Sequence, residues 1–81
     1  MDNERAKYMG YLAQYEETAR RIETTLKGLV TSMRNLLDPL EAVADLKTDL
    51  IFQQASQLAY QQGELKAVTD QIREAKRILG R

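Results

Sequence analysis

The residue types that most often carry out catalysis are scarce in this chain. It contains no Cys and no His, so thiol nucleophiles, zinc sites and histidine-based proton transfer are excluded. Ser32 and Ser56 carry hydroxyl groups, but there is no histidine to activate either of them. The sequence therefore predicts a protein that is not an enzyme and that uses no cofactor.

Two pairs of carboxylates have a spacing that would bring them together on a helix. Asp45 precedes Asp49, and Asp70 precedes Glu74, by four residues in each case. A carboxylate-bridged metal site in a helical bundle needs Glu-x-x-His repeats that point inward, and no His is available. We therefore expect these acids to lie on the polar side of their helix and to hold no metal.

Basic residues gather near the C-terminal end, where the candidate phosphate contacts are Arg73, Lys76, Arg77 and Arg81. No aromatic residue lies among them, and cations in the last turn of a helix also complement the helix dipole. The whole chain carries 12 basic and 12 acidic residues, so its net charge is zero. A small nucleic-acid-associated regulator is therefore an alternative function, and nucleic acid is not the expected partner.

A regular apolar repeat occupies the first half of the chain. Apolar residues recur from Tyr8 to Leu36 at alternating spacings of four and three, with Leu12, Tyr15, Ala19, Ile22, Leu26, Leu29 and Met33 between these two. A 3.5-residue period is typical of a left-handed coiled-coil seam. The repeat predicts a helix over about residues 3–37 that packs one face against another helix.

A break separates this helix from the second half. Pro39 has no backbone N–H and disfavours helical geometry at Asp38. Asp38 is a good N-cap, and Glu41 stands three residues later, as in a capping box. We therefore expect a turn at 38–39 and a second, antiparallel helix over about residues 40–79. A kinked continuous helix is the alternative.

The second half also carries a heptad repeat, formed by Ala44, Ile51, Leu58, Leu65, Ile72 and Leu79 at intervals of seven. The positions between them are Lys47, Gln54, Gln61, Val68 and Ala75. Gly63 interrupts the helix-forming residues, but the repeat continues through it without a shift, which favours one continuous helix over a break. Gly80 is expected to end this helix.

Gln54 and Gln61 stand at seam positions where an apolar side chain would be more stabilising. Polar seam residues can determine the register of a coiled coil, so both are predicted to be register residues. A turn at 38–39 would place Gln61 level with Tyr15 and Ala19, and Gln54 level with Ile22 and Leu26. We expect the Gln61 layer to contain a polar partner, either a tyrosine hydroxyl or the same glutamine of a second copy.

These observations predict an all-α protein: one domain, residues 1–81, folded as an antiparallel, coiled-coil-like two-helix hairpin. Helices of this length leave apolar side chains uncovered, so two hairpins are expected to dimerise into a four-helix bundle or to dock onto another helical protein. The expected function is a non-enzymatic protein–protein interaction module, such as an adaptor, a small chaperone or an assembly subunit. The predicted contact residues are Val43, Leu46, Leu50, Ile51, Phe52 and Leu58.

Two further points complete the expectation. No apolar run reaches the roughly 20 residues that a membrane span needs, and no apolar region follows the start as in a signal peptide, so a cytoplasmic protein is expected. The mid-chain Asp38–Pro39 pair resembles the turn of secretion-needle subunits, although the Asn-rich and Trp-containing segments of that family are missing. A secretion-system or phage-borne helical hairpin subunit is a further alternative, and no family is assigned.

Overall fold

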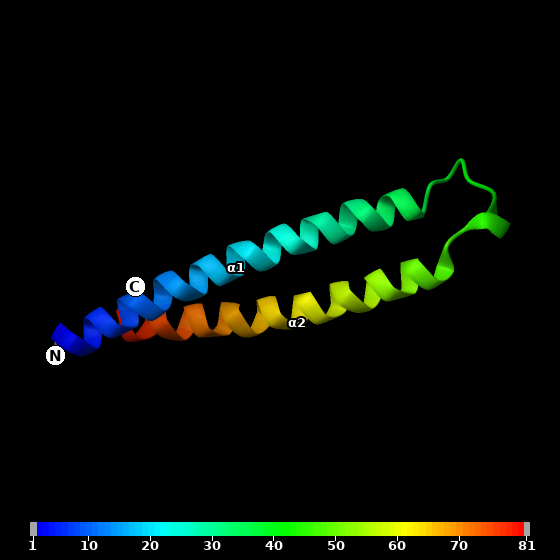
Figure 1. The fold of residues 1–81 in the computed structure, drawn as a ribbon. Helices are drawn as coiled ribbons and strands as arrows, with labels where there is room; N and C mark the ends of the chain where they lie inside the picture. Colours follow the sequence, from blue (N-terminus) through cyan, green and yellow to red (C-terminus); the bar gives the residue numbers. More distant parts are fainter. Residues whose placement is uncertain (1, 81) are drawn as a thin grey trace.

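The chain folds as two long helices that lie side by side and run in opposite directions (Figure 1). A computed structural model describes residues 2–80. Helix α1 spans Asp2–Leu36, the short 3-10 helix η1 spans Val43–Asp45, and helix α2 spans Thr48–Ile78. The two ends of the chain lie together, and the connecting loop lies at the far end. The predicted helical hairpin is confirmed, and the kinked continuous helix is wrong.

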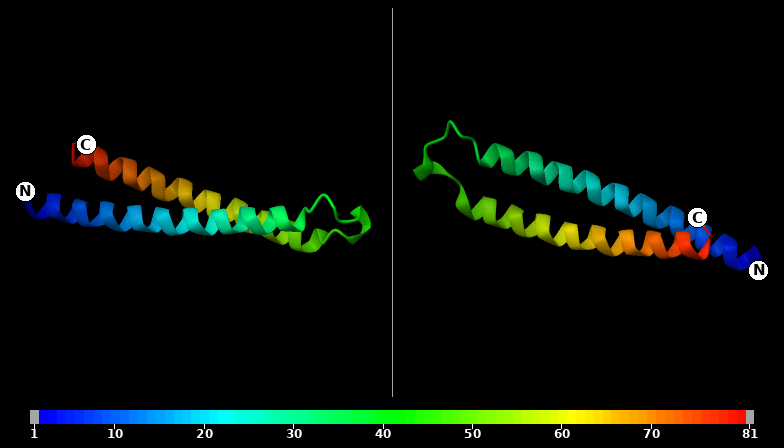
Figure 2. Two further views of the ribbon diagram at one scale, coloured as in Figure 1. Left: turned by 90° about the horizontal axis from the view of Figure 1, so that it is seen from above. Right: turned by 180° about the vertical axis from the view of Figure 1, so that it is seen from behind.

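The molecule is a rod that is one helix pair thick. Its extents are 63 × 15 × 14 Å, and the views from above and behind show no third layer over either helix (Figure 2). The helices cross as seen from above, as expected for a pair that packs seam to seam. Each helix therefore presents only one face to the other and leaves the rest of its circumference uncovered.

The apolar repeat describes the contact face correctly in both helices. Every seam position of α1 from Tyr8 to Leu36 is buried or half-buried. The same holds on α2 from Ile51 to Leu79, including the two glutamines at seam positions. The 3.5-residue period is confirmed as the pattern that holds the hairpin together.

The well-packed core lies at the terminal end of the rod. Leu12, Ala75 and Leu79 form a buried cluster, against which Tyr8 and Ile72 pack. The remaining buried apolar residues, Ala19 and Val68, belong to the same half of the molecule. Alanine at a seam position lets two helix backbones approach closely, so the small residues of this half account for its tighter packing. No side chain from residue 20 to residue 67 is buried.

The connection is much longer than the predicted turn at 38–39. Asp38 and Pro39 form a β-turn, in which the Glu41 N–H donates to the Asp38 carbonyl oxygen at 3.1 Å. The Leu40 N–H donates to Oδ1 of Asp38 at 2.9 Å. Asp at the first and Pro at the second position suit such a turn. Asp38 therefore serves a β-turn and does not cap a helix, and α2 begins at Thr48, eight residues later than expected.

The absence of a packing partner explains why no α-helix forms over 40–47. Most helical stability in proteins comes from packing an apolar face, since short isolated helices are marginal. The seam of α1 ends at Leu36, so a helix over 40–47 would extend past it with nothing to pack against. Ala44 and Lys47, which were expected at seam positions, are both exposed in the loop.

The longer loop also changes the register of the two helices. Gln61 lines one hollow with Thr18, Arg21, Ile22 and Thr25 and a second with Thr25 and Leu29, so it lies level with residues that are closer to the loop than the predicted Tyr15 and Ala19. The seams still face each other, because a slip of seven residues returns a heptad pattern to the same face. The predicted level of Gln61 is therefore wrong, although its predicted place on the seam is correct.

Two expectations for the course of α2 are confirmed. The helix runs without interruption through Gly63. It ends at Ile78, and Gly80 follows the C-cap residue Leu79 with a positive φ of 76°, a conformation that glycine adopts without steric cost. The Gly80 N–H donates to the Arg77 carbonyl oxygen at 3.2 Å, which satisfies one of the free carbonyl groups at the helix end.

Candidate interaction surface

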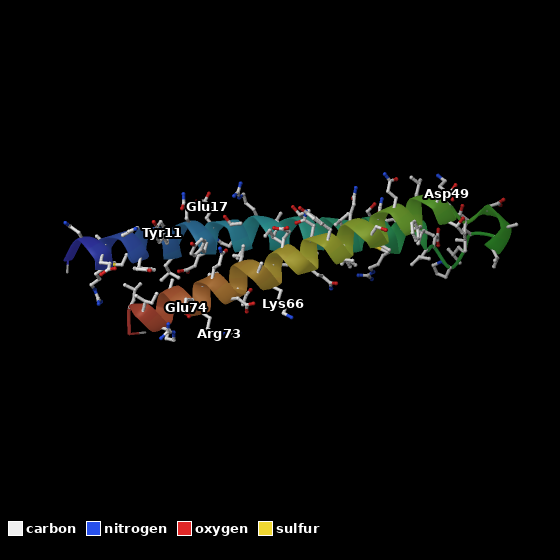
Figure 3. All side chains as sticks on the ribbon, turned by 90° about the horizontal axis from the view of Figure 1, so that it is seen from below. Tyr11, Glu17, Asp49, Lys66, Arg73 and Glu74 are labelled. Carbon is white, nitrogen blue, oxygen red and sulfur yellow. The ribbon has the colours of Figure 1, made fainter. Side chains whose placement is uncertain are left out.

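The predicted chemistry-bearing residues do not assemble into one site. Asp45 lies in η1 and Asp49 in the first turn of α2, so this pair does not share a helix. Arg73 and Glu74 lie toward the opposite end of α2 from Asp49 (Figure 3). Across the described residues 2–80, no three potential metal-ligating side chains come together.

The basic C-terminal residues are partly engaged by acids on the same helix. Arg73 lies 3.6 Å from the Asp70 carboxylate. Nε of Arg77 donates to Glu74 at 3.1 Å, and a second bond joins its Nη2 to the same carboxylate. The hydrogen bonds and positive charge of Arg77 hold the pKa of Glu74 below its ordinary value. These pairs leave a mixed-charge surface in which two of the four candidate phosphate contacts are occupied by carboxylates.

Of the other two candidate phosphate contacts, Lys76 is exposed, and Arg81 lies outside the described residues. Cations near the C-terminal end of α2 favour its dipole, which accounts for Lys76 and Arg77 in the last turn.

The predicted contact residues divide into two groups. Phe52 and Val43 are 75% and 84% exposed, and Leu50 is also exposed. Ile51 and Leu58 are half-buried on the seam against α1, and Leu46 is half-buried in the loop. The first group is therefore available to a partner, whereas the seam residues already pack within the hairpin.

The exposed residues extend into an apolar surface at the loop end of the rod. We define the loop-end surface as the large exposed apolar residues between positions 30 and 52, namely Val30, Leu37, Leu40, Val43, Leu50 and Phe52. Leu40 is 93% exposed and is not among the predicted contact residues. Only Met9, Tyr60 and Ile78 are large, apolar and exposed elsewhere in the described chain.

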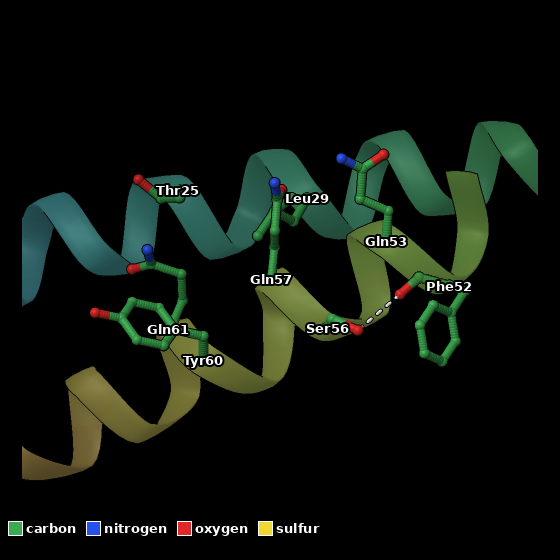
Figure 4. Close-up of a pocket in the computed structure, with 8 residues that line it drawn as sticks. All are labelled: Thr25, Leu29, Phe52, Gln53, Ser56, Gln57, Tyr60 and Gln61. Carbon is green, nitrogen blue, oxygen red and sulfur yellow. Dashed lines mark hydrogen bonds between the residues drawn. The ribbon is translucent and has the colours of Figure 1, made fainter. Parts of the chain in front are cut away.

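An open groove of about 680 Å³ runs along the same half of the molecule. We name it the amide groove. Its walls are Thr25 and Leu29 of α1 and, on α2, Phe52, Gln53, Ser56, Gln57, Tyr60 and Gln61. Figure 4 shows Gln53, Gln57 and Gln61 rising from α2 toward α1, while the Phe52 ring points away from α1. None of these residues is charged.

The hydrogen-bonding groups of the amide groove are largely unused. Ser56 Oγ donates to the Phe52 carbonyl oxygen at 3.0 Å, and Thr25 Oγ1 donates to that of Arg21 at 3.1 Å. These hydroxyl protons are therefore engaged by their own helices. Within residues 2–80, Gln53 and Gln57 make no side-chain hydrogen bond. Both amides are free to donate and to accept.

The hydrogen bonding of the two seam glutamines, Gln61 and Gln54, differs from the predicted pattern. The predicted polar partner of Gln61 is not supplied within residues 2–80, where its side chain makes no hydrogen bond. Oε1 of Gln54 is the one buried side-chain oxygen or nitrogen in that range without a hydrogen-bond partner.

One sequence signal could have located this surface. Residues 50–63 contain no charged side chain, in a chain that is 30% charged. The uncharged residues cover all sides of the helix, so the run leaves the heptad pattern unchanged. An analysis of apolar periodicity alone therefore does not reveal it. It coincides with the part of α2 in which no side chain is buried.

A second aromatic cluster lies at the terminal end of α1. The Tyr8 and Tyr11 rings meet edge to face at 5.7 Å, and Tyr15 continues the row at 6.3 Å from Tyr11. Lys7 Nζ lies 5.7 Å from the Tyr11 ring centre, within range of a cation–π interaction. These contacts lie within one helix and accompany the packed core, so they strengthen the terminal end.

Neither helix of the described chain combines the length and the apolar character needed to cross a membrane. No protein-family model, curated protein or solved structure matches this chain.

Proposed function

We propose that this chain is a non-enzymatic protein–protein interaction module that acts through apolar helix faces, and that two copies associate into a four-helix bundle. The observation that supports this most is the contrast between the two halves of the rod. The terminal half has a buried core, whereas the loop half buries no side chain and carries the loop-end surface. The concentration of large exposed apolar residues in one half of a helix pair is a reason to expect an interaction site there.

The exposed area supports the same proposal. The hairpin exposes 6418 Å², whereas a compact monomer of 9.3 kDa would expose about 5,000 Å². The excess is about 1,400 Å², more than the roughly 800 Å² that each partner buries in a standard interface. The radius of gyration, 18.3 Å, compares with about 12 Å for a compact domain of this length. Association is a direct way to cover the excess area.

The distribution of charge does not oppose association. Twelve basic and twelve acidic residues leave a net charge of zero, so two copies experience no strong overall repulsion. The same balance gives a hairpin no preference for a strongly acidic or basic partner.

Sedimentation equilibrium over a wide concentration range tests this proposal. We expect a mass of twice 9.3 kDa at micromolar concentration, with dissociation on dilution. A well-folded species that stays monomeric at all concentrations would overturn the homodimer. The hairpin could instead be monomeric alone and form a complex of defined stoichiometry with a purified helical protein. That result would support an interaction module whose partner is a different protein.

A further inference from the structure

We propose that the amide groove is the self-association site, in which α2 of a second copy lies antiparallel to α2 across a two-fold axis near Gln57. This inference rests on the proposed function, because it presumes that two copies associate. Beyond the proposed function, the inference specifies which face the two copies bury and which side chains meet at the centre of the interface.

The occupant is inferred first from charge. The groove walls are uncharged, and residues 50–63 carry no charge on any side of the helix. An exposed helix normally keeps charged residues on its outer face, yet here Phe52 and Tyr60 stand exposed among amides and small residues. A groove with uncharged walls is best filled by a segment that is itself uncharged. Residues 50–63 are the longest uncharged run in this chain, so the same segment of a second copy is the expected occupant.

The occupant is inferred second from the chemistry of the amides. A two-fold interface brings the same patch of each copy together, so the patch must be complementary to itself. A charged row fails this requirement, because like charges would meet. A glutamine carries both a donor and an acceptor, so the unpaired amides of Gln53 and Gln57 can pair with the same residues of a second copy.

The position of the axis follows from the limits of the uncharged run. Asp49 and Glu64 flank residues 50–63, and an axis near Gln57 lies at the middle of that stretch. In an antiparallel pair, an axis at Gln57 places Phe52 level with Gln62 of the partner subunit and near Tyr60 of the partner subunit. It also places Asp49 level with Leu65 of the partner subunit, between the partner's Glu64 and the partner's Lys66, so that charges of both signs lie at each end of the interface.

The groove is open and follows α2 from Phe52 to Gln61, over about 14 Å of helix. Residues 50–63 extend over about 21 Å at 1.5 Å per residue. The side-chain bodies of Leu29 and Thr25 form the second wall, so a helix in the groove contacts both helices of the hairpin. This arrangement produces a four-helix bundle with the two α2 helices at its centre.

Cysteine crosslinking tests the placement, since the chain has no cysteine of its own. Gln57→Cys and the matched control Gln71→Cys change the same residue type, on the same helix, two heptads apart, and both positions are exposed. With the axis near 57, the two copies of residue 71 lie about 42 Å apart. We expect a short bis-maleimide to crosslink most of the Gln57→Cys dimer and less than a tenth of the Gln71→Cys dimer.

The other outcomes distinguish this inference from the proposed function. Crosslinking of both variants indicates parallel helices, and crosslinking of neither variant in a chain that sediments as a dimer indicates another face. Each of these results overturns the groove placement and leaves the dimer intact. A monomeric sedimentation mass overturns the homodimer itself.

A charge substitution gives an independent measurement in the unlinked protein. Gln57→Glu would place two carboxylates together at the axis, whereas Gln71→Glu would not. We expect the dimer dissociation constant to rise at least about tenfold for Gln57→Glu and to change by less than about twofold for Gln71→Glu. Equal effects of the two substitutions would overturn the placement. Circular dichroism of each variant at high concentration verifies that the hairpin still forms.

Discussion

At the scale of single residues, the most informative side chain is Gln54. It occupies a seam position, and its Oε1 is buried without a hydrogen-bond partner in the described chain. An unsatisfied buried polar group costs about 1–3 kcal/mol. Such a cost is tolerated where a polar residue determines how helices align, which is the role predicted for Gln54 from its position in the repeat.

Replacing Gln54 by a side chain of similar length without a polar group should therefore stabilise the hairpin. We expect Gln54→Met to raise the free energy of unfolding by about 1–2 kcal/mol, measured by urea denaturation at fixed protein concentration. Gln62→Met is the matched control, because Gln62 is exposed on the same helix. It should change stability by less than about 0.5 kcal/mol. A loss of stability in Gln54→Met would show that the amide is satisfied in solution.

The Glu74–Arg77 pair makes a prediction about pH. The hydrogen bond and charge of Arg77 lower the pKa of Glu74, so the pair favours the folded state above the ordinary carboxyl pKa. This contribution is lost as the pH falls through the lowered pKa. Arg77→Gln should return the Glu74 pKa toward its ordinary value, as measured by carbon NMR of the carboxyl group. Arg73→Gln, which breaks a pair with Asp70 instead, should leave the Glu74 pKa unchanged.

At the scale of elements, α2 is a continuous helix that contains an unfavourable residue. Gly63 has nothing within 4 Å of the position that a Cβ would occupy, so no contact within the hairpin requires a glycine there. The helix forms in spite of Gly63 because the seam on either side packs against α1. Gly80 is different, because its positive φ of 76° lies in the left-handed region.

The two glycines should therefore respond to alanine in opposite directions. We expect Gly63→Ala to raise the free energy of unfolding by up to about 1 kcal/mol, which is the difference in helix propensity. Gly80→Ala should lower it by up to about 1 kcal/mol, because a Cβ is strained at positive φ. Thermal unfolding followed by circular dichroism measures both. A destabilising Gly63→Ala in the monomeric hairpin would contradict the open space within 4 Å of this position.

At the scale of the whole molecule, the rod is unevenly stabilised. The packed core lies at the terminal end, and the loop half relies on half-buried seam residues and two glutamines. A single helix pair of this length buries little surface relative to the chain that must be ordered. The proposed bundle would place the added contacts on the half that lacks a core.

This arrangement predicts a thermal midpoint that depends on protein concentration. If two copies bind in the folded state only, mass action raises the midpoint as concentration increases. We expect a rise of several degrees over a hundredfold increase in concentration, measured by calorimetry. In Gln57→Glu the rise should become smaller, whereas Gln71→Glu should behave as the parent chain does. A midpoint that is independent of concentration would contradict association in the folded state.

Much of this molecule follows from the order of its residues. The spacing from Tyr8 to Leu36 and from Ile51 to Leu79 determines two helices and the face that each buries. Pro39 determines that the chain reverses, and Gly80 determines where α2 ends. These features are local, because each depends on side chains within one or two turns of helix. Val43, Leu50 and Phe52 lie outside the heptad positions that face the other helix, so their exposure is consistent with the repeat.

Only the tertiary structure decided the register, the loop and the place of the core. A heptad repeat is unchanged by a slip of seven residues, so the sequence pattern allows several alignments of α1 with α2. The choice depends on contacts between residues far apart in the chain, such as Leu12 with Ala75 and Leu79. Packing at that end leaves residues 37–47 without a seam to pack on. They form a loop, although Asp38 and Glu41 have the residue types of a helix start.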